Sequence, residues 1–120
     1  MKHTVVIAED ERIVAEDLKA AIEESGYTVT SIVSTGEEAI QIARESNPDL
    51  FFMDIMLSGE INGIEAARNI TEEHNIPVIF CTAYNDLTTI REAATVEAFD
   101  FIKKPFNTEM IRHTLEHLFS

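Results

Sequence analysis

The chain has 120 residues, of which 45% are hydrophobic and 26% charged, and this is the profile of one soluble globular domain. A formal net charge of -13 argues against nucleic acid or an anionic membrane surface as a direct partner. Residues 1–4 lack the apolar stretch of a signal peptide, no segment approaches a membrane span, and the single cysteine, Cys81, has no partner for an internal disulfide. We therefore expect a cytoplasmic protein.

The N-terminal part of the chain alternates short apolar segments with helical patterns. Residues 4–8 form a first strand. The helix after it carries an apolar stripe: Val14, Leu18, Ala21 and Ile22. Gly26 supplies a left-handed stop, and residues 27–33 form a more polar second strand, which we expect near a sheet edge. Thr35 and Glu38 form a capping-box pattern that opens the second helix.

The segment 49–54 is the centre of the pattern. It follows Pro48 and places four apolar residues in a row before Asp54, as expected for a strand buried on both faces of a parallel sheet. A loop over residues 55–63 follows it. The third helix then has its apolar residues at helical spacing: Ile64, Ala67 and Ile70.

The C-terminal part repeats the alternation. Residues 78–82 are a fourth buried strand, residues 86–96 a fourth helix and residues 99–102 a fifth strand. The last helix has an apolar stripe: Ile111, Leu115, Leu118 and Phe119. Five strands alternating with five helices predict an α/β domain over residues 1–120, a parallel sheet covered on both faces. The third and fourth strands should be central or next to central.

Chemistry-bearing side chains follow four of the five predicted strands: Glu9, Asp10, Asp54, Thr82 and Lys104. In a parallel sheet the carboxyl ends of the strands share one edge, so these five groups should converge there. Three close carboxylates repel each other unless a cation is present, and their oxygens suit Mg²⁺. A lysine and a hydroxyl beside them suit a phosphoryl oxygen. Each residue alone has an ordinary structural reading, such as a helix cap or a solvated lysine, and only the convergence favours a site.

Four segments together resemble the receiver domain of two-component response regulators. They are residues 6–11 (Val-Ile-Ala-Glu-Asp-Glu), 52–54 (Phe-Met-Asp), 81–83 (Cys-Thr-Ala) and 101–106 (Phe-Ile-Lys-Lys-Pro-Phe). They occur in the family's order and cover essentially the whole chain. The resemblance implies a doubly wound, flavodoxin-like sheet of five strands in the order 2-1-3-4-5.

The resemblance also implies roles for the acidic residues and the lysine. Asp54 would accept a phosphoryl group from a phosphohistidine, supplied by a sensor histidine kinase or a phosphotransfer protein. Asp10, Asp54 and the backbone carbonyl of Met56 would bind Mg²⁺, and Glu9 would act through a bound water. Lys104 would pair with Asp54 before the reaction and with the phosphoryl group after it.

A switch is implied as well. Thr82 would move to hydrogen-bond the phosphoryl oxygen, Phe101 would move inward with it, and the peptide bond before Pro105 would be cis. The signal would reach the face built by the fourth helix, the fifth strand and the fifth helix, and from there a downstream effector domain or target protein. Dimerisation through the last two helices stays open.

Three departures from the family pattern stand out, and two further positions affect hydrolysis. The loop 54–63 is one residue longer than the common pattern, which leaves its conformation open. Glu97 stands where glycine is frequent, so the turn there either carries strain or ends differently. Phe101 replaces the commoner tyrosine. Met56 and Tyr84 are bulky and hold no amide or carboxylate to position a water, so we expect slow hydrolysis of the phosphoryl group, although both could equally be surface filler.

Other patterns in the sequence have a simpler interpretation or compete with the receiver domain. His113 and His117 have a spacing that can bind zinc, but they lie opposite the apolar stripe and are expected to be solvated. Cys81 is expected to be a small core residue. The leading interpretation is a signalling module and not a metabolic enzyme. An aspartyl-phosphate phosphatase would place a second acid where Met56 stands, and a flavodoxin-like electron carrier would bind a flavin.

Overall fold

The structure is a computed structural model that describes residues 3–83 and 87–120. Strands in the described part are β1 (Thr4–Ala8), β2 (Thr28–Val33), β3 (Leu50–Met53), β4 (Val78–Thr82) and β5 (Asp100–Lys103). Helices in the same part are α1 (Arg12–Glu24), α2 (Gly36–Ser46), α3 (Gly63–His74), α4 (Leu87–Ala94) and α5 (Thr108–Phe119). Asp86, expected to begin the fourth helix, lies outside the described residues.

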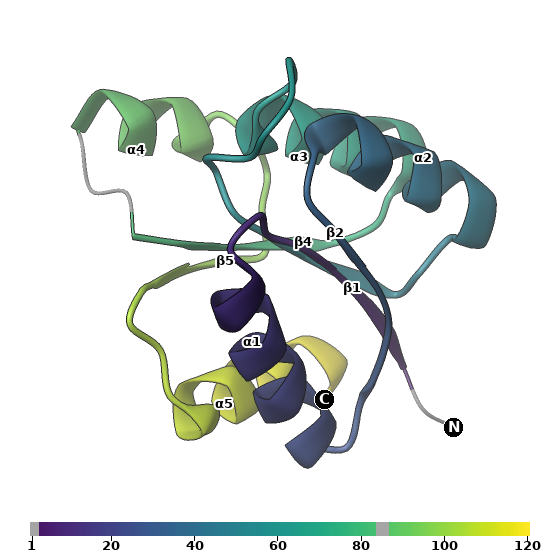
Figure 1. Cartoon of the computed structure of the whole chain (residues 1–120), viewed down its shortest axis with the longest axis vertical. Helices are drawn as coiled ribbons and strands as arrows, with labels where there is room; N and C mark the ends of the chain where they lie inside the picture. Colours follow the sequence, from purple (N-terminus) through teal and green to yellow (C-terminus); the bar gives the residue numbers. More distant parts are fainter. Residues whose placement is uncertain (1–2, 84–86) are drawn as a thin grey trace.

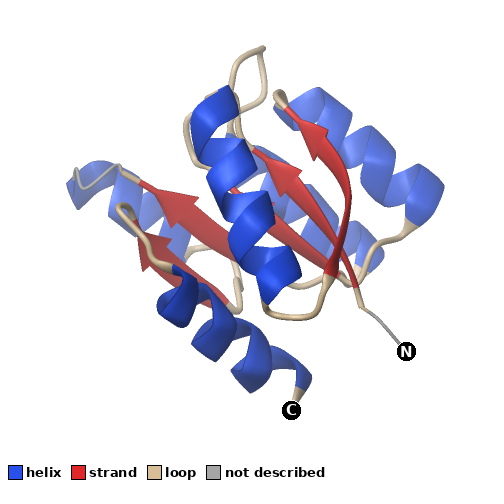
Figure 2. Cartoon of the chain, turned by 60° about the horizontal axis from the view of Figure 1, so that its bottom comes forward, coloured by secondary structure: helices blue, strands red, loops and turns tan. Residues whose placement is uncertain are grey.

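All strand pairs of the sheet are parallel, and the strand order is β2-β1-β3-β4-β5. Figure 2 shows the arrows running the same way, so their carboxyl ends share one edge. This confirms the fold class and the strand order that the resemblance implied. The most continuously apolar segment, β3, is the middle strand, β4 is its neighbour, and the more polar β2 is at an edge, as expected.

Helices cover both faces of the sheet (Figure 1). The buried apolar side chains beneath them form two clusters, one on each face. Phe51 and Met53 contribute to the layer beneath α2, α3 and α4. Leu50 and Phe52 contribute to the layer beneath α1 and α5. Because successive side chains of a strand point to opposite faces, a strand between two such layers must be apolar at every position. This explains the unbroken apolar sequence just before Asp54.

Local signals fix several element ends. The Thr35 side chain accepts the Glu38 backbone N–H at 3.0 Å, which confirms the predicted cap of α2. Gly26 has φ +100°, the left-handed conformation expected after α1. Among the described residues, positive φ outside glycine is confined to Asn47 and Asn75. Glu97 therefore carries no such strain, and the turn after α4 ends differently from a glycine turn.

Phe99 was expected to open the fifth strand, whereas β5 begins at Asp100. Phe99 and Phe101 are both exposed. Their exposure follows from the position of β5 at the edge of the sheet, where it has a strand partner on one side only. The apolar sequence of this segment does not distinguish such an edge strand from a buried one. His113 and His117 are exposed, as expected. Within the described residues, no helix is long and apolar enough to cross a membrane.

Candidate functional site

The carboxyl edge of the sheet holds a cavity of about 380 Å³. Its walls come from four separate segments of the chain: Asp10, Glu11, Asp54, Met56, Thr82, Ala83 and Lys104. The sheet therefore brings together the residues that follow β1, β3, β4 and β5, as the chain order predicts for a parallel sheet. Glu9 is buried beside them and reaches the same group through Lys104.

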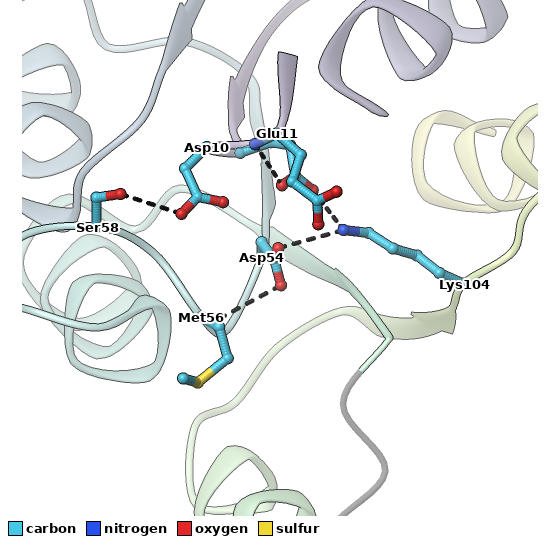
Figure 3. A network of polar contacts seen from close by, with 7 residues as sticks. Asp10, Glu11, Asp54, Met56, Ser58 and Lys104 are labelled. Atoms are coloured by element: carbon cyan, nitrogen blue, oxygen red, sulfur yellow. Dashed lines mark hydrogen bonds and ion pairs between the residues drawn. The ribbon is translucent and has the colours of Figure 1, made fainter. Parts of the chain in front are cut away.

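Lys104 lies between two buried carboxylates. Its Nζ is 2.5 Å from Glu9 Oε1. The same Nζ is 3.2 Å from Asp54 Oδ2 (Figure 3). Burial alone would lower the pKa of Lys104, but the hydrogen bond to Glu9 and the charge of Asp54 outweigh it and raise that pKa. Lys104 is thus a permanent cation at neutral pH, shared by both acids.

Glu9 is fixed by contacts on both of its oxygens. Oε1 accepts from Lys104, and Oε2 accepts the Glu11 backbone N–H at 3.1 Å. Burial raises the pKa of Glu9, and the Lys104 hydrogen bond offsets part of that rise. Both oxygens are therefore committed to protein donors, which suits a role through water better than direct metal coordination.

Three carboxylates lie close enough together to surround a metal ion, Asp10 and Asp54 as direct ligands and Glu9 through a water. Glu9, Asp10 and Asp54 each offer an oxygen, and these oxygens all lie within 4.8 Å of one another. An all-oxygen, all-anionic set fits Mg²⁺, which takes one or two carboxylates and keeps several waters. Asp10 is exposed and Asp54 lines the cavity, so both can reach such an ion.

The backbone around Asp54 is tightly fixed. Its N–H donates to the Ala8 carbonyl at 2.9 Å, and its Oδ1 accepts the Met56 N–H at 3.4 Å. Gly63 begins α3 directly against it, and a Cβ at that position would lie 1.8 Å from the Asp54 carbonyl oxygen. Only glycine fits there. The start of α3 thus supports the backbone of the candidate acceptor.

The remaining predicted site residues lie as follows. Thr82 is buried at the end of β4 and lines the cavity with Asp54 and Lys104. Phe101 is 37% exposed, with its ring centroid 6.1 Å from that of Phe80, so it faces outward in this structure. The Lys104–Pro105 peptide bond is cis, the conformation that the resemblance implies. Tyr84 lies outside the described residues.

Comparison with known proteins decides the family. The family model of the response regulator receiver domain matches residues 5–116. The chain belongs to this family.

Relatives of this receiver domain include regulators from two bacteria. It is 33% identical over 113 residues to the transcriptional regulatory protein YdfI of Bacillus subtilis, covering 93% of this chain and 53% of that protein. It is 34% identical over 122 residues to the sensory transduction protein LytT of Oceanobacillus iheyensis, covering 98% and 48%. The receiver domain thus spans about half the length of these curated relatives.

Solved structures agree with the fold. The signal receiver domain of a modulated diguanylate cyclase from Desulfovibrio desulfuricans G20 is 33% identical, with a TM-score of 0.92 and coverage of 98% of this chain and 93% of that one. A putative response regulator from Chloroflexus aurantiacus J-10-fl is 26% identical, with a TM-score of 0.88 and coverage of 98% of each chain.

Two contacts of the receiver domain were missed from the sequence. Lys104 is closer to Glu9 than to Asp54, whereas only the Asp54 pairing was expected. The Ser58 hydroxyl donates to Asp10 Oδ2 at 3.1 Å. A serine in a polar loop gives no signal of such a contact, because the contact depends on how the loop 54–63 folds back toward Asp10.

Proposed function

We propose that this receiver domain accepts a phosphoryl group on Asp54 from the phosphohistidine of a sensor histidine kinase or phosphotransfer protein. The observation that carries the proposal is the ion pair between half-buried Lys104 and buried Asp54 at 3.2 Å, set in an acidic group whose ligand oxygens lie within 4.8 Å of one another. The proposal treats residues 1–120 as one receiver domain that works as a signalling module.

In the proposed reaction an Asp54 oxygen attacks phosphorus, the phosphorus–nitrogen bond of the donor breaks, and the imidazole leaves. A carboxylate is a weak nucleophile, so positioning and charge neutralisation must supply the rate. Lys104 is already within ion-pair distance of Asp54 and can follow the developing charge on the phosphoryl oxygens. When bound by Asp10, Asp54 and the Met56 carbonyl, Mg²⁺ supplies further positive charge to those oxygens.

Thr82 and Phe101 would carry the change to the surface. The acyl phosphate adds charge and strong acceptor oxygens beside Thr82, whose hydroxyl can donate to one of them. Phe101 is outward and packs at the edge of an apolar cavity of about 390 Å³ lined by α4 and β5 residues. Its inward movement would change the face built by α4, β5 and α5, and shift the population that a downstream effector domain or target protein recognises.

Intact-protein mass after incubation with acetyl phosphate and Mg²⁺ tests the proposal, for wild type and Asp54→Ala. One added phosphoryl group that requires Mg²⁺ and is absent in the variant is the expected result. Without an adduct on wild type, beryllofluoride binding would separate a donor-restricted receiver from a degenerate one. A small-molecule phosphatase assay distinguishes this function from an aspartyl-phosphate phosphatase, and a yellow colour of the purified protein would mark a flavin-binding electron carrier. The family match already argues against both.

The hydrolysis rate gives a second test. Met56 is 51% exposed beside Asp54, and its thioether offers no strong hydrogen bond to an attacking water. Replacing Met56 with Asn and Tyr84 with Glu should shorten the lifetime of the phosphoryl group, followed as loss of the added mass. An unchanged lifetime would show that these side chains do not set the rate.

A further inference from the structure

The loop between β3 and α3 is tied to the start of α2. Thr35, the cap of α2, forms an isolated parallel bridge with Ser58. Two residues on, the Glu60 N–H donates to Glu37 Oε2 at 3.1 Å. The backbone on both sides of Gly59 is therefore fixed by contacts with one helix terminus.

Gly59 lies at the centre of the contact between this loop and the start of α2. Its φ is +94°, and a Cβ there would lie 2.8 Å from Glu37 Oε1. The left-handed conformation favours glycine, and a Cβ there would displace the Glu37 carboxylate from its contact with the loop. Hydrogen bonds from the backbone N–H groups of Glu37 itself and of Glu60 lower the pKa of Glu37, so it stays ionised and keeps accepting at neutral pH.

Ser58 directs its hydroxyl from this braced loop to Asp10. The Oγ donates to Asp10 Oδ2 at 3.1 Å across 48 residues of sequence (Figure 3). Asp10 is exposed and is one of the three acids whose ligand oxygens lie within 4.8 Å. Repulsion from Glu9 and Asp54 favours rotation of an exposed carboxylate out into water. The Ser58 hydrogen bond opposes that rotation.

We propose that Ser58 is a positioning residue for Mg²⁺ binding. Its hydroxyl holds the Asp10 carboxylate in the orientation that binds the ion, and Glu37 holds the loop that carries Ser58. This inference rests on the proposed function, because it needs Asp10 to bind the metal ion. A donor to the ligand carboxylate pre-orients it, and loss of such outer contacts typically weakens metal binding about 10- to 100-fold. With both partners exposed, we expect about 10-fold for Ser58→Ala.

Calorimetric titration of the whole chain with MgCl₂ tests the proposal. Ser58→Ala should raise the Kd for Mg²⁺ about 10-fold, and Ser58→Thr, which keeps the hydroxyl, should bind like wild type. Ser34→Ala is the matched control, because the Ser34 hydroxyl donates to Glu38 and not to Asp10. A Kd for Ser58→Ala within about twofold of wild type would overturn the proposal.

Glu37→Ala tests the brace. It should weaken Mg²⁺ binding in wild type but add little in the Ser58→Ala background, because both changes act through the same hydroxyl. Additive effects would refute the role of Glu37. In the absence of Mg²⁺ the midpoint of thermal unfolding should be the same for Ser58→Ala and Ser34→Ala, which separates positioning from a general loss of stability.

Asp10→Asn separates the failure of this inference from that of the function. If wild type binds Mg²⁺ and Asp10→Asn does not, a normal Kd for Ser58→Ala refutes the positioning role alone. If wild type does not bind Mg²⁺, or Asp10→Asn binds it equally well, the proposed metal site is wrong and the role of Ser58 with it.

Discussion

Replacing Lys104 with Met should destabilise the protein in a way that depends on pH. The change keeps the length of the side chain and removes the cation shared by Glu9 and Asp54, whose side chains are only 3% and 8% exposed. A buried pair that loses one partner leaves an uncompensated charge, which commonly costs about 3–5 kcal/mol. The buried Glu9 carboxylate would then take up a proton to escape that cost.

Proton uptake sets the magnitude. A carboxyl group with the ordinary pKa of 4.5 that must be neutral at pH 7 costs about 3.4 kcal/mol, because each pH unit corresponds to ~1.36 kcal/mol. The pKa of Glu9 is already raised in the folded protein, so its contribution to stability is fully present below the unfolded-state pKa of 4.5. That contribution is lost as the pH rises through the folded-state pKa. We expect Lys104→Met to lose about 3 kcal/mol at pH 7 and under about 1 kcal/mol at pH 5.

Urea unfolding followed by circular dichroism, with EDTA present, measures this loss at pH 5, 6 and 7. Lys103→Met is the matched control, because Lys103 is exposed and its removal should change stability by less than about 0.5 kcal/mol. A loss below about 1 kcal/mol at pH 7, or an equal loss at pH 5 and pH 7, would refute the reasoning that Lys104 neutralises buried carboxylates.

Four further outcomes follow from burial, backbone conformation and close contacts. Gly63→Ala should lower the free energy of unfolding by about 3 kcal/mol or more, because its Cβ would lie 1.8 Å from the Asp54 carbonyl oxygen. Gly26→Ala meets open space but has a φ of +100°, so it should lower the free energy of unfolding by only about 1–2 kcal/mol. Equal losses for the Gly63 and Gly26 variants in urea unfolding would contradict this. Glu9→Gln removes a carboxyl group with a raised pKa, so between pH 4.5 and pH 7 wild type should lose stability relative to the variant. A difference between their midpoints of thermal unfolding that stays constant with pH would refute this. Burial raises the pKa of Cys81 to about 12, so iodoacetamide at pH 8 should leave it unmodified in the folded protein, and alkylation at the unfolded rate would disprove it.

The sequence predicted the fold because its strongest signals are topological. Four uninterrupted apolar residues before Asp54 require burial on both faces, and short loops between alternating elements require parallel strands. Once the strands are parallel, Asp10, Asp54, Thr82 and Lys104 must share one edge, whatever the details of packing. The structure places all four on the walls of one cavity.

The missed features depend on tertiary geometry. The sequence does not show which acid lies nearest to Lys104, because that depends on where the fold places the Glu9 side chain. The 2.5 Å contact between Lys104 and Glu9 could therefore not be predicted. The Ser58 contact needs the loop to pair with Thr35, which local propensity does not encode. Phe101 is apolar yet exposed, because its position at the sheet edge is decided by the whole fold and not by its neighbours in sequence.

The acidic group and Lys104 have a consequence for electroneutrality. Counted by formal charge, three carboxylates and one ammonium leave two negative charges at the site, the amount that one divalent cation neutralises. In the proposed reaction the phosphate-bearing donor is itself an anion, so a metal-free site with this net charge would repel it at close range, where salt screens little because the Debye length is about 8 Å. Metal occupancy would then decide more than the rate of the chemical step. It would set whether an anionic donor can approach the receiver at all.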